Sequence, residues 1–331
     1  MTRRLVLASN SFAGSAYVAH ALKQGCEVVG VSRSNEPSPL FLPYRHLPSS
    51  DQARFRFEQA DLNHNLDNIF KLIDEFRPEV IVDFAGQGMV AESWAAPEQW
   101  YQTNVVAKAR LHSFLRHKDW LSHYIRISTP EVYGSSDHLI SEDQTYKPST
   151  PYAVSHTATD MSLKAFHNSL KFPVMIGRFS NFFGEHQQLY RIVPKTILCV
   201  LTGQKLPLHG GGTSVRAFIH ASDVATGIEA MIARGTMGEV YHFSTDQFLS
   251  IRNVVEMICA KLGVAFETAV EVSPERLGKD QAYLMATTKA RSELGWSEKL
   301  SFEAGLERTI EWVKANLSEL RALPWTYQHK A

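Results

Sequence analysis

The sequence predicts an α/β protein built on a doubly wound parallel sheet, with a smaller, irregular α/β lobe after it. In the first half of the chain, short apolar runs alternate with amphipathic stretches of helical period, which is typical of βαβ units in a sheet covered on both faces. After about residue 178 this regularity is lost, and glycine-containing loops such as 208–212 interrupt the pattern. With 331 residues and 44% hydrophobic content, the chain can bury a large core.

Five strands and four helices are expected to alternate in the first lobe. The predicted strands are 5–7, 28–31, 80–84, 124–127 and 174–176, and the predicted helices lie near 13–24, 65–76, 98–117 and 152–170. Further helical stretches are expected near 191–203, 250–262 and 302–316. This order predicts a Rossmann-type domain over residues 1–178, with returning segments near 215–245, and a second lobe over 179–331. Such sheets bind ligands at the carboxyl ends of their strands.

Charge and cysteine content exclude several classes of partner. Lys plus Arg and Asp plus Glu number 34 each, so no net charge attracts the protein to nucleic acid or to an anionic membrane. No apolar run reaches the ~18 residues of a membrane span. The three cysteines, Cys26, Cys199 and Cys259, suggest neither a disulfide framework nor a metal site, and the histidines lack ligand spacing. A cytoplasmic protein without a metal is therefore expected.

Two motifs carry the chemistry. Residues 128–134 read Ser-Thr-Pro-Glu-Val-Tyr-Gly, and residues 151–156 read Pro-Tyr-Ala-Val-Ser-His after a Thr150 helix cap. They resemble the catalytic core of the extended short-chain dehydrogenases that modify nucleotide sugars. The resemblance implies a nicotinamide cofactor and catalytic roles for Thr129, Tyr152 and His156. His156 stands where that family has a lysine, four residues after the tyrosine and thus on the same helical face.

The cofactor signal rests on the same resemblance. Residues 8–15 lie where the family has a glycine-rich turn, whose backbone closely approaches a pyrophosphate at a helix N-terminus. Only Gly14 of its three glycines is present, and an ordinary strand-to-helix turn is the alternative. The cofactor contacts that the resemblance implies are Ser11, Phe12, Gly14, Asp61, Leu62, Ala85 and Gln87, together with Tyr152 and His156.

The end of the second strand bears on the choice of cofactor. Ser32 and Arg33 stand where an NAD-binding member usually has an acidic residue for the ribose hydroxyls. A guanidinium suits a 2′-phosphate, so NADP is favoured over NAD. The alternative is that Arg33 is a solvated loop residue and that the protein uses NAD.

The second lobe carries the substrate signal. Residues 178–184 resemble an Arg-x-x-Asn-x-x-Gly turn whose asparagine, here Asn181, contacts the substrate diphosphate. Arg216 and Arg276 match two further positions, and the resemblance also implies Ser93. Together they predict a nucleotide-diphosphate hexose as substrate. Each arginine taken alone would more often be a surface or salt-bridge residue.

Glu131 separates the reaction types within the resembled family. A 4,6-dehydratase needs a base for the C5 proton in addition to oxidation at C4, and a glutamate can supply it. Pro130 stands where many dehydratases have an aspartate. The resembled GDP-mannose 4,6-dehydratases also lack that aspartate, and their Thr-x-Glu arrangement is the closer match, so Glu131 would act as both base and acid. The alternatives are a C4 epimerase, a uronic-acid decarboxylase, or a catalytically impaired paralogue that only binds sugar nucleotides. A homodimer is expected because the family often forms one.

Overall fold

The computed structural model describes residues 1–274 and 281–330. Seven parallel strands form one sheet in the order β11-β7-β5-β4-β1-β2-β3. Their bounds are β1 Arg3–Leu7, β2 Glu27–Ser32, β3 Phe55–Gln59, β4 Val80–Asp83, β5 His123–Ser128, β7 Val174–Phe179 and β11 Val240–Phe243. The order reverses between β1 and β4, as in the doubly wound dinucleotide-binding fold. The predicted fold class and its five strands are confirmed.

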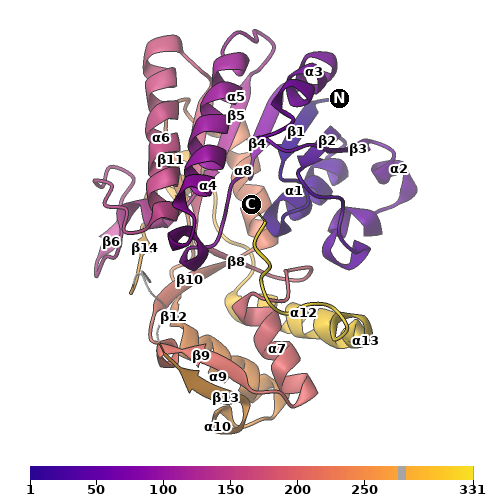
Figure 1. The fold of residues 1–331 in the computed structure, drawn as a ribbon, viewed down its shortest axis with the longest axis vertical. Coiled ribbons are helices and arrows are strands. Elements are labelled where there is room, and N and C mark those ends of the chain that lie inside the picture. Colours follow the sequence, from indigo (N-terminus) through magenta and orange to yellow (C-terminus); the bar gives the residue numbers. More distant parts are fainter. Residues whose placement is uncertain (275–280, 331) are drawn as a thin grey trace.

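Helices cover both faces of this sheet (Figure 1). The helices of the first lobe are α1 Phe12–Lys23, α2 Ser49–Gln52, α3 Leu66–Phe76, α4 Pro97–Tyr101, α5 Lys108–Leu115 and α6 Pro151–Leu170, and α8 Ala221–Arg234 returns to the sheet together with β11. The stretch predicted as one helix near 98–117 is divided by a π-helical segment, Gln102–Ala107. Thr150 caps α6 by accepting a hydrogen bond from the Ala153 N–H, with Pro151 in the first turn, as the sequence predicts.

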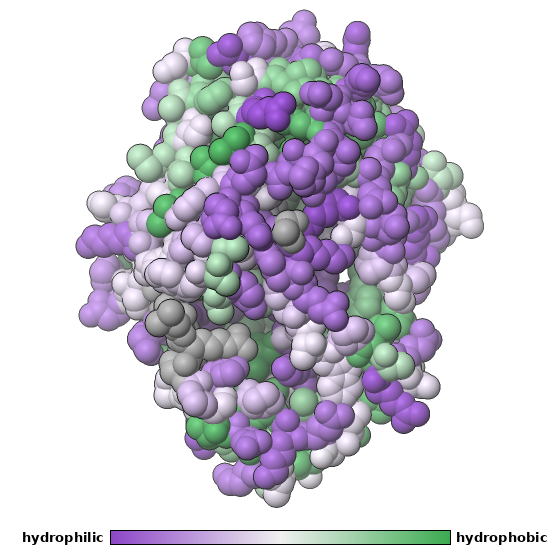
Figure 2. Space-filling view, viewed as in Figure 1, coloured by the Kyte–Doolittle hydropathy of each residue, from purple (hydrophilic) through white to green (hydrophobic). Residues whose placement is uncertain are grey.

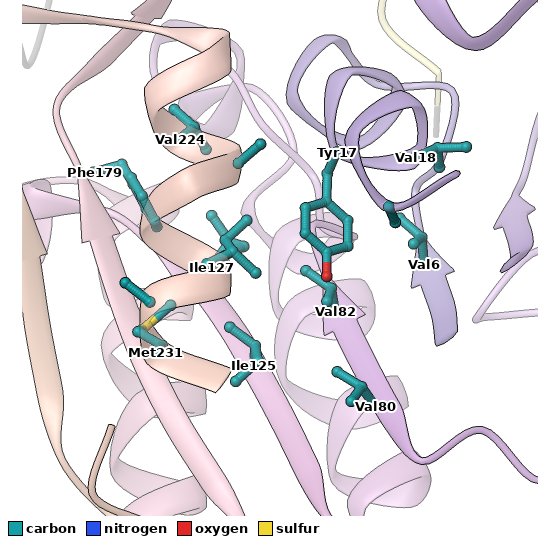
Figure 3. Close-up of a cluster of buried hydrophobic side chains, with 14 of the residues drawn as sticks. Val6, Tyr17, Val18, Val80, Val82, Ile125, Ile127, Phe179, Val224 and Met231 are labelled. Atoms are coloured by element: carbon teal, nitrogen blue, oxygen red, sulfur yellow. The ribbon is translucent and has the colours of Figure 1, made fainter. Parts of the chain in front are cut away.

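Alternating strand residues build two separate cores. Val82 and Ile125 face α1 and α8, where Tyr17 and Met231 meet them (Figure 3). Ile81, the neighbour of Val82, points to the other face and packs among residues of α3, α5 and α6. A fully buried parallel strand must be apolar on both faces, and this explains why these strands read as continuous apolar runs.

The second lobe is built from short strands and amphipathic helices. Its elements are β8 Asn181–Phe183, β9 Leu206–His209, β10 Val215–His220, β12 Phe248–Ser250, β13 Val270–Ser273, α7 Ile192–Thr202, α9 Ile251–Leu262, α10 Phe266–Ala269, α12 Phe302–Ala315 and α13 Leu317–Leu320. Helix α11 Thr288–Leu294 instead packs against β11 and α8 of the large sheet. A short pair, β6 Leu139–Ile140 with β14 Leu284–Met285, links the lobe to the loop after β5. The second lobe thereby lies below the carboxyl ends of the large sheet (Figure 1).

The described residues contain no helix long and apolar enough to cross a membrane. Within the same residues, no three His, Cys, Asp or Glu side chains gather as a metal site would require. Figure 2 shows that hydrophilic residues cover most of the viewed face, and its apolar areas are small.

The core around β5 offers a test of the packing. Ile125 is fully buried, so Ile125→Ala should lower the free energy of unfolding by about 2–5 kcal/mol through lost burial and a residual cavity. The matched control is Leu139→Ala, whose side chain is 57% exposed and whose loss should cost no more than ~0.5 kcal/mol. Urea denaturation measures both, and equal losses would contradict the assignment of this core.

Candidate active site

The catalytic candidates meet at the carboxyl end of β5. Thr129 follows the strand, and its hydroxyl accepts a hydrogen bond from the Glu131 N–H at 3.2 Å, which starts a short 3₁₀ turn, Pro130–Tyr133. On α6, the rings of Tyr152 and His156 lie 4.5 Å apart between centroids. Burial raises the pKa of Tyr152 and the Glu131 carboxylate raises it further, while hydrogen bonding with Thr129 lowers it. Glu131, Thr129 and Tyr152 therefore lie close together at the end of β5.

His156 is not the cation that the missing lysine would have supplied. Its ring is buried, and Nδ1 lies 3.0 Å from Nη2 of Arg126 on β5. Burial, followed by the charges of Arg126 and Lys108, lowers the pKa of His156 well below its ordinary value. A proton on the ring would have to share a dry site with a guanidinium, so the neutral imidazole is favoured.

Arg126 belongs to a buried network of charged side chains next to His156. Lys108 bonds both carboxylate oxygens of Asp83, and Arg178 donates to Asp160 Oδ2 at 2.9 Å. Arg126 lies between these pairs, 3.7 Å from Asp83 Oδ2 and 3.8 Å from Asp160 Oδ1. Although burial raises the pKa of Asp83, Lys108 and Arg126 lower it more, so its carboxylate stays ionised.

The turn after β1 fits a pyrophosphate despite its missing glycines. Ala8 adopts a left-handed backbone with φ of 58°, the conformation for which glycine is usually selected. The Ser11 hydroxyl donates to the Ala8 carbonyl at 2.7 Å and accepts from the Gly14 N–H at 3.1 Å, capping α1. A Cβ on Gly14 would meet the Ala8 oxygen at 2.2 Å, so this position tolerates only glycine. Phe12, the first residue of α1, is buried.

The remaining predicted cofactor residues lie along the same sheet edge. The Ser32 hydroxyl accepts from the Asn10 N–H at 3.0 Å, which ties β2 to the β1 turn, and Arg33 follows it. Asp61 caps the turn after β3 by accepting from the Asn63 N–H at 2.6 Å, and the neighbouring Leu62 is buried.

Two further residues from the predicted set follow β4. The Ala85 N–H donates to Asp83 Oδ1 at 3.0 Å. Gln87 is buried, and its N–H donates to the Asn104 side chain at 2.7 Å.

The predicted substrate residues are separated into two groups. Asn181 and Arg216 share a neighbour, because the Tyr283 hydroxyl donates to Asn181 Oδ1 at 3.0 Å and the Arg216 guanidinium stacks on the Tyr283 ring at 4.2 Å. Ser93 is fully buried and donates to the Val90 carbonyl at 2.6 Å, which is a structural hydrogen bond. Arg276 lies outside the described residues.

Sequence reasoning missed several residues of this site. The sequence pattern places Arg126 only within a predicted strand. A charged residue between Ile125 and Ile127 in a buried strand nevertheless indicates that an oppositely charged or polar partner is buried beside it. Asn104, in the π-helical segment, also donates to Ser155 of α6 at 2.9 Å and so joins α6 to the Gln87 loop. π-helical segments are frequent at functional sites, but no sequence pattern predicts this one.

The fold and site together define a dinucleotide-binding α/β protein of the dehydrogenase type. The family model described as GDP-mannose 4,6 dehydratase matches residues 5–309. The chain is 30% identical to a dTDP-glucose 4,6-dehydratase of Streptomyces antibioticus over 94% of this chain and 92% of that one. It is 28% identical to the enzyme of the same name from Xanthomonas campestris pv. campestris, over 96% and 94% of the two chains.

Solved structures agree with these sequence matches. A dTDP-glucose 4,6-dehydratase of Streptomyces venezuelae with NAD bound superposes with a TM-score of 0.85 at 27% identity, covering 96% of this chain and 98% of that one. The dTDP-glucose 4,6-dehydratase of Bacillus anthracis in complex with NAD superposes with a TM-score of 0.86 at 26% identity, covering 97% of this chain and 99% of that one. A UDP-glucose 4-epimerase of Thermotoga maritima, at 22% identity and a TM-score of 0.86 over 96% and 100% of the chains, shares the fold.

The chain belongs to the GDP-mannose 4,6-dehydratase family within the extended short-chain dehydrogenases. The predicted class, a nucleotide-sugar 4,6-dehydratase-like enzyme dependent on a nicotinamide cofactor, is confirmed.

The strained turn after β1 yields a stability test. Ala8→Gly should raise the free energy of unfolding by about 0.5–1 kcal/mol, because relief of the left-handed alanine exceeds the entropic cost of glycine. The matched control, Ala13→Gly within α1, should lower it by about 1 kcal/mol. Urea denaturation of both variants makes the comparison, and a loss at both positions would show that Ala8 carries no strain.

Proposed function

We propose that this protein is a nucleotide-sugar 4,6-dehydratase in which Tyr152, Thr129 and Glu131 carry the acid–base chemistry. The observation that supports this is the shared environment of the three side chains, where the Glu131 carboxylate and the Thr129 hydroxyl both act on the Tyr152 phenol. A bound nicotinamide would accept hydride from sugar C4 and return it at C6. Ser11, Gly14, Ser32, Asp61, Ala85 and Gln87 would hold that cofactor at the carboxyl edge.

The protein side chains would then move the protons. Tyr152 removes the proton of the C4 hydroxyl, and Thr129 holds that oxygen by hydrogen bonding. The C4 ketone acidifies the C5 proton, which Glu131 removes. Pro130 has no proton to donate, so the protonated Glu131 returns its proton to the departing C6 hydroxyl, which leaves as water. When hydride is returned at C6, C5 takes up a proton, and this balances the proton that Tyr152 removed from the C4 hydroxyl. Both steps at Glu131 need a carboxyl group that faces the sugar from the side of Tyr152.

We further propose that the lobe over 179–331 binds the substrate diphosphate through Asn181, Arg216 and Arg276, while residues 1–178 with the returning segments near 215–245 hold the cofactor. Arg216 is supported by the main chain, since its Nη1 donates to the Val215 and Gln281 carbonyls at 2.7 and 3.0 Å. A guanidinium fixed in this way binds phosphate with a defined orientation. Unchanged sugar-nucleotide affinity in Arg216→Ala would contradict this role.

We also propose a cytoplasmic homodimer. Cys26, Cys199 and Cys259 are free and buried, as expected in a reducing compartment. Apolar side chains are exposed on adjoining helices, with Met161 of α6 at 58% and Val106 of the π-helical segment at 46%. Val154 lies two turns before Met161 and is 39% exposed, so an apolar stripe continues along α6. A second copy of the chain would cover it, and a monomeric mass by light scattering would contradict the dimer.

Glu131→Gln tests the reaction. The amide cannot accept the C5 proton, so formation of a product lighter by about 18 mass units should fall ~10²–10⁴-fold, while sugar-nucleotide affinity stays unchanged. Mass spectrometry and calorimetry follow the two quantities, with the exposed Glu311→Gln as the control. An unchanged product mass in the parent protein would favour the epimerase, a loss of carbon dioxide the decarboxylase, and binding without turnover the impaired paralogue.

Arg33→Ala tests the proposed preference for NADP. If Arg33 binds the 2′-phosphate, the parent should bind NADP more tightly than NAD, and the variant should lose about 1.5–3 kcal/mol of NADP affinity, the usual range for a hydrogen bond to a charged group. NAD affinity should not change. Stronger binding of NAD by the parent in calorimetry would assign NAD as the cofactor.

A further inference from the structure

The contact between Arg126 and His156 fixes the state of the imidazole. A guanidinium only donates hydrogen bonds, so Nδ1 of His156, 3.0 Å from Nη2 of Arg126, must accept. The single ring proton of the neutral imidazole then lies on Nε2. His156 therefore keeps a donor on the ring nitrogen that does not face Arg126, as a lysine ammonium would provide at this position.

The charge of Arg126 is only partly balanced by its neighbours. The Asp83 and Asp160 carboxylates lie 3.7 and 3.8 Å from it, beyond hydrogen-bond distance, and each has a closer cation in Lys108 or Arg178. These five side chains hold three positive charges against two negative ones. One positive charge in excess remains behind the ring of His156.

We propose that Arg126 is a positioning residue that divides the role of the missing lysine with His156. Arg126 supplies the positive charge that favours an ionised Tyr152, and His156 supplies the N–H donor. The charge acts across the imidazole, whose centroid is 4.5 Å from that of the tyrosine ring. The assignment rests on the proposed function, because Tyr152 must be ionised to remove the proton of the C4 hydroxyl.

The sign of the effect follows from the groups that face Tyr152. Burial and Glu131 raise the pKa of the phenol, whereas hydrogen bonding with Thr129 and the charges of Arg126 and Arg191 lower it. Removing the charge of Arg126 therefore leaves Tyr152 harder to ionise. Activity that requires tyrosinate would then begin at higher pH, instead of falling equally at every pH.

Two matched variants separate charge from hydrogen bonding. Arg126→Gln keeps an N–H donor for His156 and removes the charge, while Arg126→Lys keeps the charge. In Arg126→Gln, the pH–rate profile should move upward by about one unit or more, and turnover at neutral pH should fall ~10²-fold. Arg126→Lys should keep the parental profile. An unmoved profile in Arg126→Gln, or equal shifts in both variants, would overturn the proposal.

Two readouts keep the test independent of folding and of turnover. If Arg126→Gln does not fold, the double variant Arg126→Gln with His156→Lys restores the number of positive charges. It should fold and keep the parental pH–rate profile. A pH–rate profile shifted upward in the double variant would overturn the proposal. Nitrogen NMR of the ligand-free parent should show the neutral His156 ring protonated at Nε2 between about pH 6 and 8. A cationic His156 ring would overturn the assignment even if the protein dehydrates sugars. A neutral His156 ring would support the assignment even if the protein does not dehydrate sugars.

A second, independent observation concerns the segment 324–330. It leaves α13 in the second lobe and runs up to the carboxyl edge of the large sheet (Figure 1). Tyr327 packs on Tyr190 with ring centroids 5.2 Å apart, and His329 stacks on Trp100 at 5.1 Å and 6°. His329 also lies 2.6 Å from Gln99 Oε1.

Lys330 bridges two loops on either side of the predicted cofactor turn. Its carbonyl accepts from the Gln87 side chain at 2.8 Å, and its Nζ donates to Ser34 Oγ at 2.9 Å. Gln87 follows β4 and Ser34 follows β2, while β1 lies between these strands in the sheet. The segment thus crosses the carboxyl end of β1, where the pyrophosphate of a dinucleotide would lie on α1.

We infer that the segment 324–330 and the dinucleotide exclude each other from the carboxyl end of β1, so that the segment is an autoinhibitory strap. Cofactor affinity is then reduced by the fraction of molecules in which the segment occupies this edge. His329→Ala removes the Trp100 stack and the Gln99 contact, and it should tighten NAD and NADP binding several-fold in calorimetry. The control is the neighbouring exposed Gln328→Ala, which should bind as the parent does.

Hydrogen exchange supplies the second measurement for the strap. Saturating dinucleotide should increase amide exchange across 324–330 in the parent, because the segment is displaced. Weaker cofactor binding in His329→Ala, or slower exchange of the segment with cofactor present, would show that the segment instead clasps the bound dinucleotide and would overturn the inference.

Discussion

The site depends on a guanidinium held in the interior of the sheet. Arg126 is fully buried on β5, and burying such a charge is costly unless it is paired. Asp83, on the neighbouring strand β4, and Asp160, on α6, supply the compensating charges. Their positions follow from the sheet, since β4 and β5 are adjacent and α6 packs against the face that Arg126 reaches.

This network links stability to chemistry. The same carboxylates that make a buried Arg126 tolerable bind Lys108 and Arg178, which leaves Arg126 only partly neutralised beside His156. A histidine in the lysine position is therefore not a simple loss of charge. The positive charge is carried by Arg126 on β5 instead of by a lysine on α6, and the imidazole lies between that charge and the tyrosine.

The cofactor edge combines two kinds of constraint. The turn after β1 keeps the tight geometry of a glycine-rich loop because Ala8 accepts a left-handed backbone and Ser11 caps the helix. The segment 324–330 approaches the same edge from the opposite lobe. Its contacts come from α4, from the loops after β2 and β4, and from Tyr190 before α7. Only the folded chain brings these together, so the place of the segment could not be read from its composition.

The sequence alone determined the fold class, five of the six first-lobe strands of the large sheet, the start of α6 at Thr150-Pro151 and the family, because apolar periodicity, capping residues and linear motifs are local properties. It also named Thr129, Glu131, Tyr152 and His156 as one site, from their places at a strand end and on the following helix. Those roles remain predictions.

Only the tertiary structure decided the charge of His156, the burial of Arg126 between two carboxylates and the path of the segment 324–330. Protonation depends on burial and on charges that arrive from other strands, and a tail is positioned by surfaces far from it in the chain. Neither property is encoded within a window of neighbouring residues, because both arise from contacts made only after the sheet has formed.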